Sequence, residues 1–216
     1  MPNQSGSVYG LTILSPIVND PHASVSHDLQ LRIILGTMPR GQESPFAKVN
    51  STHMCRLTVM NDVIYVGMPS CEEHLKSQYL VFECNFDGEL DPYLHRMARE
   101  IPETVDAVWS HCQGYPGVSD PNAFAAYMKK CQLTTTFYFA DVNDKTVQQT
   151  LNALQTQSAV GAFVERTAGL HGAELQQAFA KLITDLRAAP PPAPGSGRED
   201  VNLCSVAGVG AASIHE

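Results

Sequence analysis

The sequence predicts an α+β protein built on a single antiparallel sheet, and two observations lead to this prediction. Short apolar or alternating segments at 11–18, 52–60, 79–86 and 134–141 have the pattern of strands. The stretches between and after them have the periodicity of amphipathic helices. With 216 residues, 44% of them hydrophobic, the chain is long enough for one domain with a substantial core.

The first strand and the first helix have clear boundary signals. Residues 11–18 are rich in β-branched side chains, and this strand is expected to end near Pro16. Ser26 is a good N-cap for a helix over 27–35, which Gly36 would end. The chain therefore begins with a strand followed by a helix.

The next two strands, 52–60 and 79–86, are expected to pair with each other. Alternation places one apolar set on a shared face: His53, Cys55, Leu57, Val59, Leu80, Phe82, Cys84 and Phe86. Arg56 and Glu83 then fall on the opposite, less apolar face. If the strands pair, this arginine and glutamate are placed for a cross-strand ion pair.

Proline marks the start of the next three predicted helices. Asp91 and Pro92 predict a helix to about Glu100, and Pro102 predicts a second helix over 102–112. Asp120 and Pro121 repeat the same signal for a helix over 121–131. In the second of these helices, the spacing directs Trp109 and Cys112 inward.

The remaining chain is expected to form the last strand, two helices and a tail. Residues 134–141 are predicted as a strand, and 144–166 and 172–188 as amphipathic helices. The stretch 189–216 begins with a Pro/Gly-rich linker that cannot pack, and it is expected to be a flexible tail. The predicted domain therefore covers 8–188.

The order β-α-β-β-α(α)-β is that of a ferredoxin-like fold with a C-terminal helical extension. Such a sheet carries helices on one face, so its other face needs a cover. A second subunit, the C-terminal helices or a ligand would serve. We expect a homodimer, because Met54 and Met60 share that open face.

Charge and targeting signals restrict the partners and the compartment. The formal net charge is −8, and no Lys/Arg-rich run is present, which disfavours nucleic acid and anionic lipid as partners. The N-terminus lacks a secretory signal pattern, and no apolar run is long enough to span a membrane. Six cysteines without a C-x-x-C pair indicate reduced thiols in the cytoplasm.

One part of the chain resembles a known group of proteins. The segments THMCRLTVM, YLVFECNFDGELDPYL and VWSHCQGYPG, within 52–117, resemble bacterial proteins of ferredoxin-like fold that share a strand–NFDG–helix–WxxCxG[FY]P pattern. By fold, their nearest characterised relatives are the dimeric α/β-barrel proteins, which include haem-degrading monooxygenases and peroxidases. The resemblance implies a pocket between sheet and helices that is used for oxidative chemistry, with haem as the implied cofactor.

The candidate site residues have two interpretations. Under the functional interpretation, His111 is an axial ligand or acid/base, Trp109 contacts the cofactor, and Arg56 and Tyr115 contact the substrate. Under the structural interpretation, which the sequence favours, Trp109 fills the core and His111 sits at a helix C-terminus. His53, Cys55 and Cys84 have ligand chemistry but no recognised spacing, so no metal site is predicted.

These observations leave two main function hypotheses. The first is an oxidoreductase-like protein, monooxygenase- or peroxidase-like, that acts on a small molecule. The second is a non-catalytic module for small-molecule binding or assembly, or a carrier of a tethered C-terminal peptide. A common cavity for His111, Tyr115 and Arg56 would favour the first hypothesis.

Overall fold

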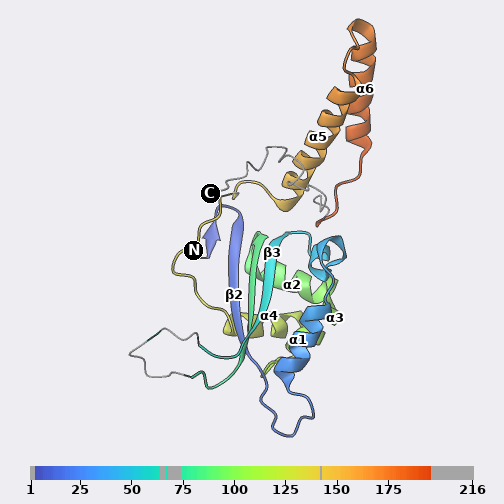
Figure 1. Cartoon of the computed structure of the whole chain (residues 1–216). Coiled ribbons are helices and arrows are strands. Elements are labelled where there is room, and N and C mark those ends of the chain that lie inside the picture. Colours follow the sequence, from blue (N-terminus) through green and yellow to red (C-terminus); the bar gives the residue numbers. More distant parts are fainter. Residues whose placement is uncertain (1–2, 64–66, 68–73, 142, 196–216) are drawn as a thin grey trace, which may run out of the picture.

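The computed structural model describes residues 3–63, 67, 74–141 and 143–195, and it forms a mixed α+β structure (Figure 1). The strands are β1 (Gln4–Ser5), β2 (Val8–Pro16), β3 (Thr52–Met60) and β4 (Tyr79–Asp87). The α-helices are α1 (His27–Thr37), α2 (Leu90–Glu100), α3 (Pro102–Trp109), α4 (Pro121–Lys130), α5 (Val147–Arg166) and α6 (Gly172–Ala188). Short 3-10 helices at Gly41–Glu43 and Pro45–Lys48 lead into β3.

The four strands form one antiparallel sheet in the order β1-β2-β4-β3. The predicted pairing of 52–60 with 79–86 is confirmed, and Arg56 lies directly across from Glu83. On the other side of β4, Thr12 of β2 is also a partner of Glu83. Threonine, glutamate and arginine therefore form one row across the sheet.

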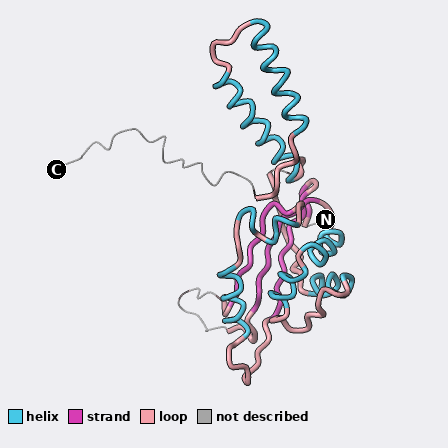
Figure 2. Tube along the Cα trace, turned by 90° about the vertical axis from the view of Figure 1, so that its right-hand side faces the viewer, coloured by secondary structure: helices cyan, strands magenta, loops and turns pink. Residues whose placement is uncertain are grey.

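The core lies between one face of the sheet and the helices α1 to α4 (Figures 1 and 2). The largest fully buried side chains come from both layers: Leu11, Ile13, Leu31, Leu80, Phe82, Phe86, Tyr93, Leu94, Met97, Ile101, Trp109 and Phe124. In the described part of the chain no helix covers the opposite face of the sheet (Figures 1 and 2), and Met54 on this face is 64% exposed. The prediction that helices shield one face is confirmed.

Local chemistry explains several helix boundaries. Asp120 caps α4 as predicted, because its carboxylate accepts a hydrogen bond from the Asn122 N–H. Helix α3 ends at Trp109, earlier than expected. After it, the Gln113 N–H donates to the Pro16 carbonyl, and the His111 carbonyl accepts from the Val18 N–H, so the chain joins the end of β2 instead of continuing the helix.

The predicted strand at 134–141 is wrong: these residues have no regular secondary structure. Residues 131–133 and the N-terminal segment both form hydrogen bonds with the outer edge of β2. The Leu14 N–H donates to the Cys131 carbonyl, and Asn3 binds both backbone groups of Gly10. Because that edge is already paired, the chain after Leu133 leaves it and runs over the open face of the sheet.

The expected alternation in β3 is wrong at its first residues. A β-bulge lies between Thr52 and Met54, so His53 has no partner residue in β4. His53 does not join the apolar set of Cys55. Its Nε2 atom lies 2.7 Å from Asp87 Oδ1 instead.

Helices α5 and α6 form a hairpin that projects beyond the end of the sheet (Figures 1 and 2). Thr146 and Gln149 form a capping box at the start of α5. The rings of Phe163 in α5 and Phe179 in α6 are in contact, with their centroids 6.0 Å apart. Leu182 of α6 is also buried. Within the described ranges, neither these helices nor any other is long and apolar enough to cross a bilayer.

Candidate functional site

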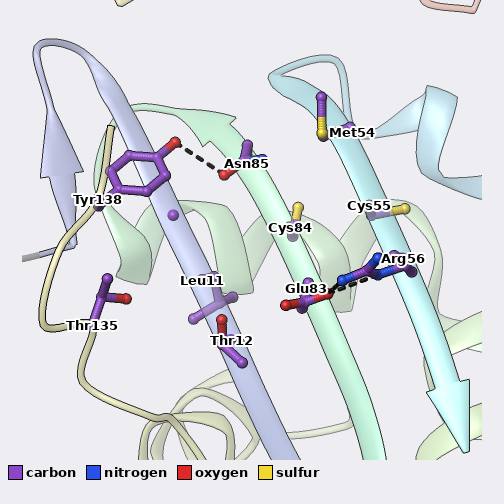
Figure 3. A pocket seen from close by; sticks show the side chains of 11 residues that line it. Leu11, Thr12, Met54, Cys55, Arg56, Glu83, Cys84, Asn85, Thr135 and Tyr138 are labelled. Carbon is purple, nitrogen blue, oxygen red and sulfur yellow. Dashed lines mark hydrogen bonds and ion pairs between the residues drawn. The ribbon is translucent and has the colours of Figure 1, made fainter. Parts of the chain in front are cut away.

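A hollow of about 400 Å³ lies on the open face of the sheet, beneath the segment that follows α4 (Figure 3). Strands β2, β3 and β4 form its floor, and residues 135–138 form one wall. It is lined by Gly10, Leu11, Thr12, Met54, Cys55, Arg56, Glu83, Cys84, Asn85, Thr135 and Tyr138. Apolar, thioether, hydroxyl, amide and charged groups therefore meet in one concave surface.

Tyr138 forms the wall of the hollow and is fixed at two points. Its ring lies against Gly10, where a Cβ atom would come within 2.5 Å of a ring carbon. Its hydroxyl donates a 2.9 Å hydrogen bond to Asn85 Oδ1 (Figure 3). Burial, and then the nearby Cys84, raise the pKa of the Tyr138 hydroxyl, so this group is a neutral donor at physiological pH.

Arg56 and Glu83 form an ion pair on the floor of the hollow. The Arg56 Nε atom donates to Glu83 Oε2 at 2.7 Å, and Nη2 contacts the same oxygen. This confirms the predicted cross-strand pair. The arginine side chain is 73% exposed, so the pair contributes only about 0–1 kcal/mol to stability. Its effect is to neutralise both charges beside the hollow.

The two cysteines of the hollow are unsuited to nucleophilic chemistry. Cys55 and Cys84 are partners across β3 and β4. Burial raises the pKa of the Cys55 thiol to about 11 and raises that of Cys84 further. The Sγ atom of Cys84 also lies 3.0 Å from the Tyr93 hydroxyl in the core. Both thiols are protonated at neutral pH, and a protonated thiol is a poor nucleophile and metal ligand.

His53, Cys55 and Cys84 do not form a metal-binding group. The bulge removes His53 from the cysteines, and its imidazole pairs with Asp87. Among the residues that the structure describes, no three side chains of His, Cys, Asp or Glu are grouped as metal ligands. The second oxygen of Asp87 accepts a 2.8 Å hydrogen bond from the Val147 N–H at the start of α5.

Trp109 lies in the core, on the other side of the sheet from Arg56. It is fully buried, and its ring meets the edge of Phe82 with centroids 5.4 Å apart. Trp109 therefore fills the core, as the structural interpretation of this residue predicts. A buried indole presents no surface to a porphyrin, so Trp109 does not fit the role of a haem contact in this arrangement.

His111 and Tyr115 lie away from the hollow and have other partners. The Nδ1 atom of His111 is 2.8 Å from that of His27, the first residue of α1. Burial, and then the charge of His27, lower the pKa of His111. The Tyr115 hydroxyl donates a 2.6 Å hydrogen bond to Asp106. Of the predicted site residues, only Arg56 lines the hollow.

Sequence reasoning missed Tyr138, Asn85 and the role of Gly10. One signal was present: a glycine in the middle of a strand often marks a close approach by another part of the chain. Gly10 has such a neighbour in Tyr138.

Comparisons of the chain with protein-family models, with curated proteins and with solved structures found no match.

Proposed function

We propose that the chain is a non-catalytic small-molecule-binding module whose ligand occupies the hollow on the open sheet face. The single observation that carries the proposal is the concave surface that Tyr138 builds over β2 and β4. A volume of about 400 Å³ is within the range of small-molecule sites. The wall is held by a hydrogen bond and a close ring contact, so the surface exists before a ligand arrives.

The chemistry of the lining favours binding over catalysis. The charges of Arg56 and Glu83 neutralise each other, and the cysteine thiols are protonated. These four residues therefore provide the hollow with neither an acid/base pair nor an activated nucleophile. The oxidoreductase hypothesis called for a common cavity for His111, Tyr115 and Arg56, and these residues have separate surroundings.

The same lining defines the class of ligand. Tyr138 supplies an aromatic face and Met54 a polarizable thioether, which suit a flat, partly apolar molecule. Thr12, Thr135 and Asn85 supply hydroxyl and amide groups for hydrogen bonds. The net charge of −8 disfavours a polyanion. We therefore propose a neutral, planar molecule with one or two hydrogen-bonding groups.

Indole is a suitable probe, because it is neutral and flat and has one N–H donor. We expect its addition to shift the backbone amide resonances of Gly10, Glu83, Asn85 and Thr135 in a saturable way. Amides of the α5–α6 hairpin serve as the internal control and should not move. Shifts that increase linearly without saturation, or that spread evenly over the chain, would contradict the proposal.

A further inference from the structure

Helix α5 has two different faces, and only one of them packs on α6. Its less exposed side chains recur every four residues: Leu151, Gln155, Ala159 and Phe163. The last of them contacts Phe179 of α6. A second set is exposed: Ala153, Leu154, Gln157, Val160, Gly161 and Val164. At about 100° per residue, the second set forms a stripe about 120° wide on the opposite side of the helix.

This outer stripe of α5 is apolar and exposed. Leu154, Val160 and Val164 are 50%, 42% and 61% exposed, respectively. A Cβ atom on Gly161 would meet no atom within 4 Å, so another helix has room to approach closely there. The hairpin projects beyond the sheet, and both views show no other helix of the described residues beside its outer side (Figures 1 and 2). A two-helix hairpin buries only one seam, so the stripe needs a partner from outside.

The charge distribution favours a second copy of the chain as the partner. The protein carries a net charge of −8, yet α5 has no Asp, Glu, Lys or Arg from Val147 to Val164. In a two-fold contact each residue near the axis faces its own copy, so any charge there would repel itself. A charged partner protein, in contrast, would find no complementary group on this surface.

The polar side chains of α5 suit the same partner. Its polar residues up to Val164 are glutamine, asparagine, threonine and serine. An amide group has both a donor and an acceptor, so Gln157 in the middle of the stripe can bond to its own copy. Apolar and amide groups together form a self-complementary surface, about 30 Å long for a helix of 20 residues.

We infer that the outer stripe of α5 pairs with the same stripe of a second copy, so that the two α5 helices pack against each other and each α6 lies on the far side of its own α5. This interface does not include the hollow, and it differs from the sheet-to-sheet dimer that the sequence leads us to expect. Ligand binding and dimerisation are therefore separable. Each copy keeps its open sheet face.

Sedimentation of the full chain tests the inference. Wild-type protein at about 100 μM should have twice the monomer mass of 23.5 kDa. Val160→Glu and Val164→Glu should each weaken dimerisation at least tenfold, because a glutamate would face its own copy. Gln176→Glu adds the same charge to an exposed site on α6 and should leave the mass unchanged.

Met54→Glu distinguishes the two possible interfaces. This residue lies on the open sheet face, so the variant should remain a dimer and should retain its helical circular dichroism. A wild-type monomer at the same concentration would overturn the inference. Dissociation by Met54→Glu, with Val164→Glu still dimeric, would also overturn it and would assign the interface to the sheet. Binding of a different protein to a monomeric chain would also overturn the inference.

Discussion

The aromatic ring of Tyr138 lies against the backbone of Gly10, a residue far from it in sequence, and this contact forms the wall of the hollow. Gly10 is a strand residue whose own side chain would occupy the position of the ring. The contact is therefore possible only because residue 10 has no side chain. Three of the neighbouring groups, Asn3, Thr135 and Asn85, hold the same region with hydrogen bonds.

Gly10→Ala should displace Tyr138 while the sheet persists. The added methyl group would stand 2.5 Å from a ring carbon, which is too close, so the ring must move and its bond to Asn85 should break. We expect a loss of about 1 kcal/mol in unfolding free energy, which is typical for one hydrogen bond. Urea denaturation measures it. Gly36→Ala, where a Cβ would meet nothing within 4 Å, is the matched control and should not destabilise the protein.

His111 should make the stability of the protein pH-dependent. The fold lowers the pKa of His111 from its ordinary value of 6.5, because of burial and the charge of His27. Below pH 6.5 the unfolded chain therefore binds more protons than the native state. The contribution of His111 to the free energy of unfolding should be constant above pH 6.5. Below pH 6.5, the free energy of unfolding should decrease as the pH falls.

His111→Gln tests this linkage, because it removes the titrating group. The difference in unfolding free energy between wild type and variant should change with pH below 6.5 and be level above it. A difference that is the same at every pH from acid to neutral would show that folding does not change the pKa of His111.

Asp87→Asn should weaken the attachment of the α5–α6 hairpin to the sheet. The carboxylate binds His53 through one oxygen and the Val147 N–H through the other. Bonds to a charged group contribute more than neutral ones, so we expect a loss of about 1–3 kcal/mol. Hydrogen exchange at the first turn of α5 should also accelerate. Asp144→Asn, at an exposed position, should change neither quantity.

Trp109→Ala should strongly destabilise the protein. The indole is fully buried against Phe82, so its removal leaves a large cavity and should cost about 3–5 kcal/mol. Trp109 is the only tryptophan, so its fluorescence in the wild-type protein reports on the core. Emission should be blue-shifted in the native state and red-shifted after denaturation. Native emission typical of exposed indole would contradict the buried position.

The strands β3 and β4 could be predicted from sequence because alternation is a local property. The face of Arg56 and Glu83 followed from period two, and their cross-strand pair followed from that face. The helix starts at Pro102 and Pro121 were equally local, because proline fixes the first turn. These elements depend on neighbours within a few residues.

The site itself depends on contacts between distant segments. The pattern at 134–141 is typical of a strand, but the edge of β2 was already taken by Asn3 and Cys131. No local pattern indicates that competition, so the sequence predicts a strand here and does not indicate the contact of Tyr138 with Gly10. In the same way, nothing near His27 in sequence indicates that it meets His111.

Occlusion of the hollow tests the central claim most directly. Thr12 lies in its floor, so Thr12→Trp should fill it, while Thr58→Trp, on the same face but outside the hollow, should leave it open. Indole affinity should fall at least about tenfold in the first variant and should be unchanged in the second. Equal indole binding by wild type and both variants, with all three folded, would contradict the assignment of the ligand site to this hollow.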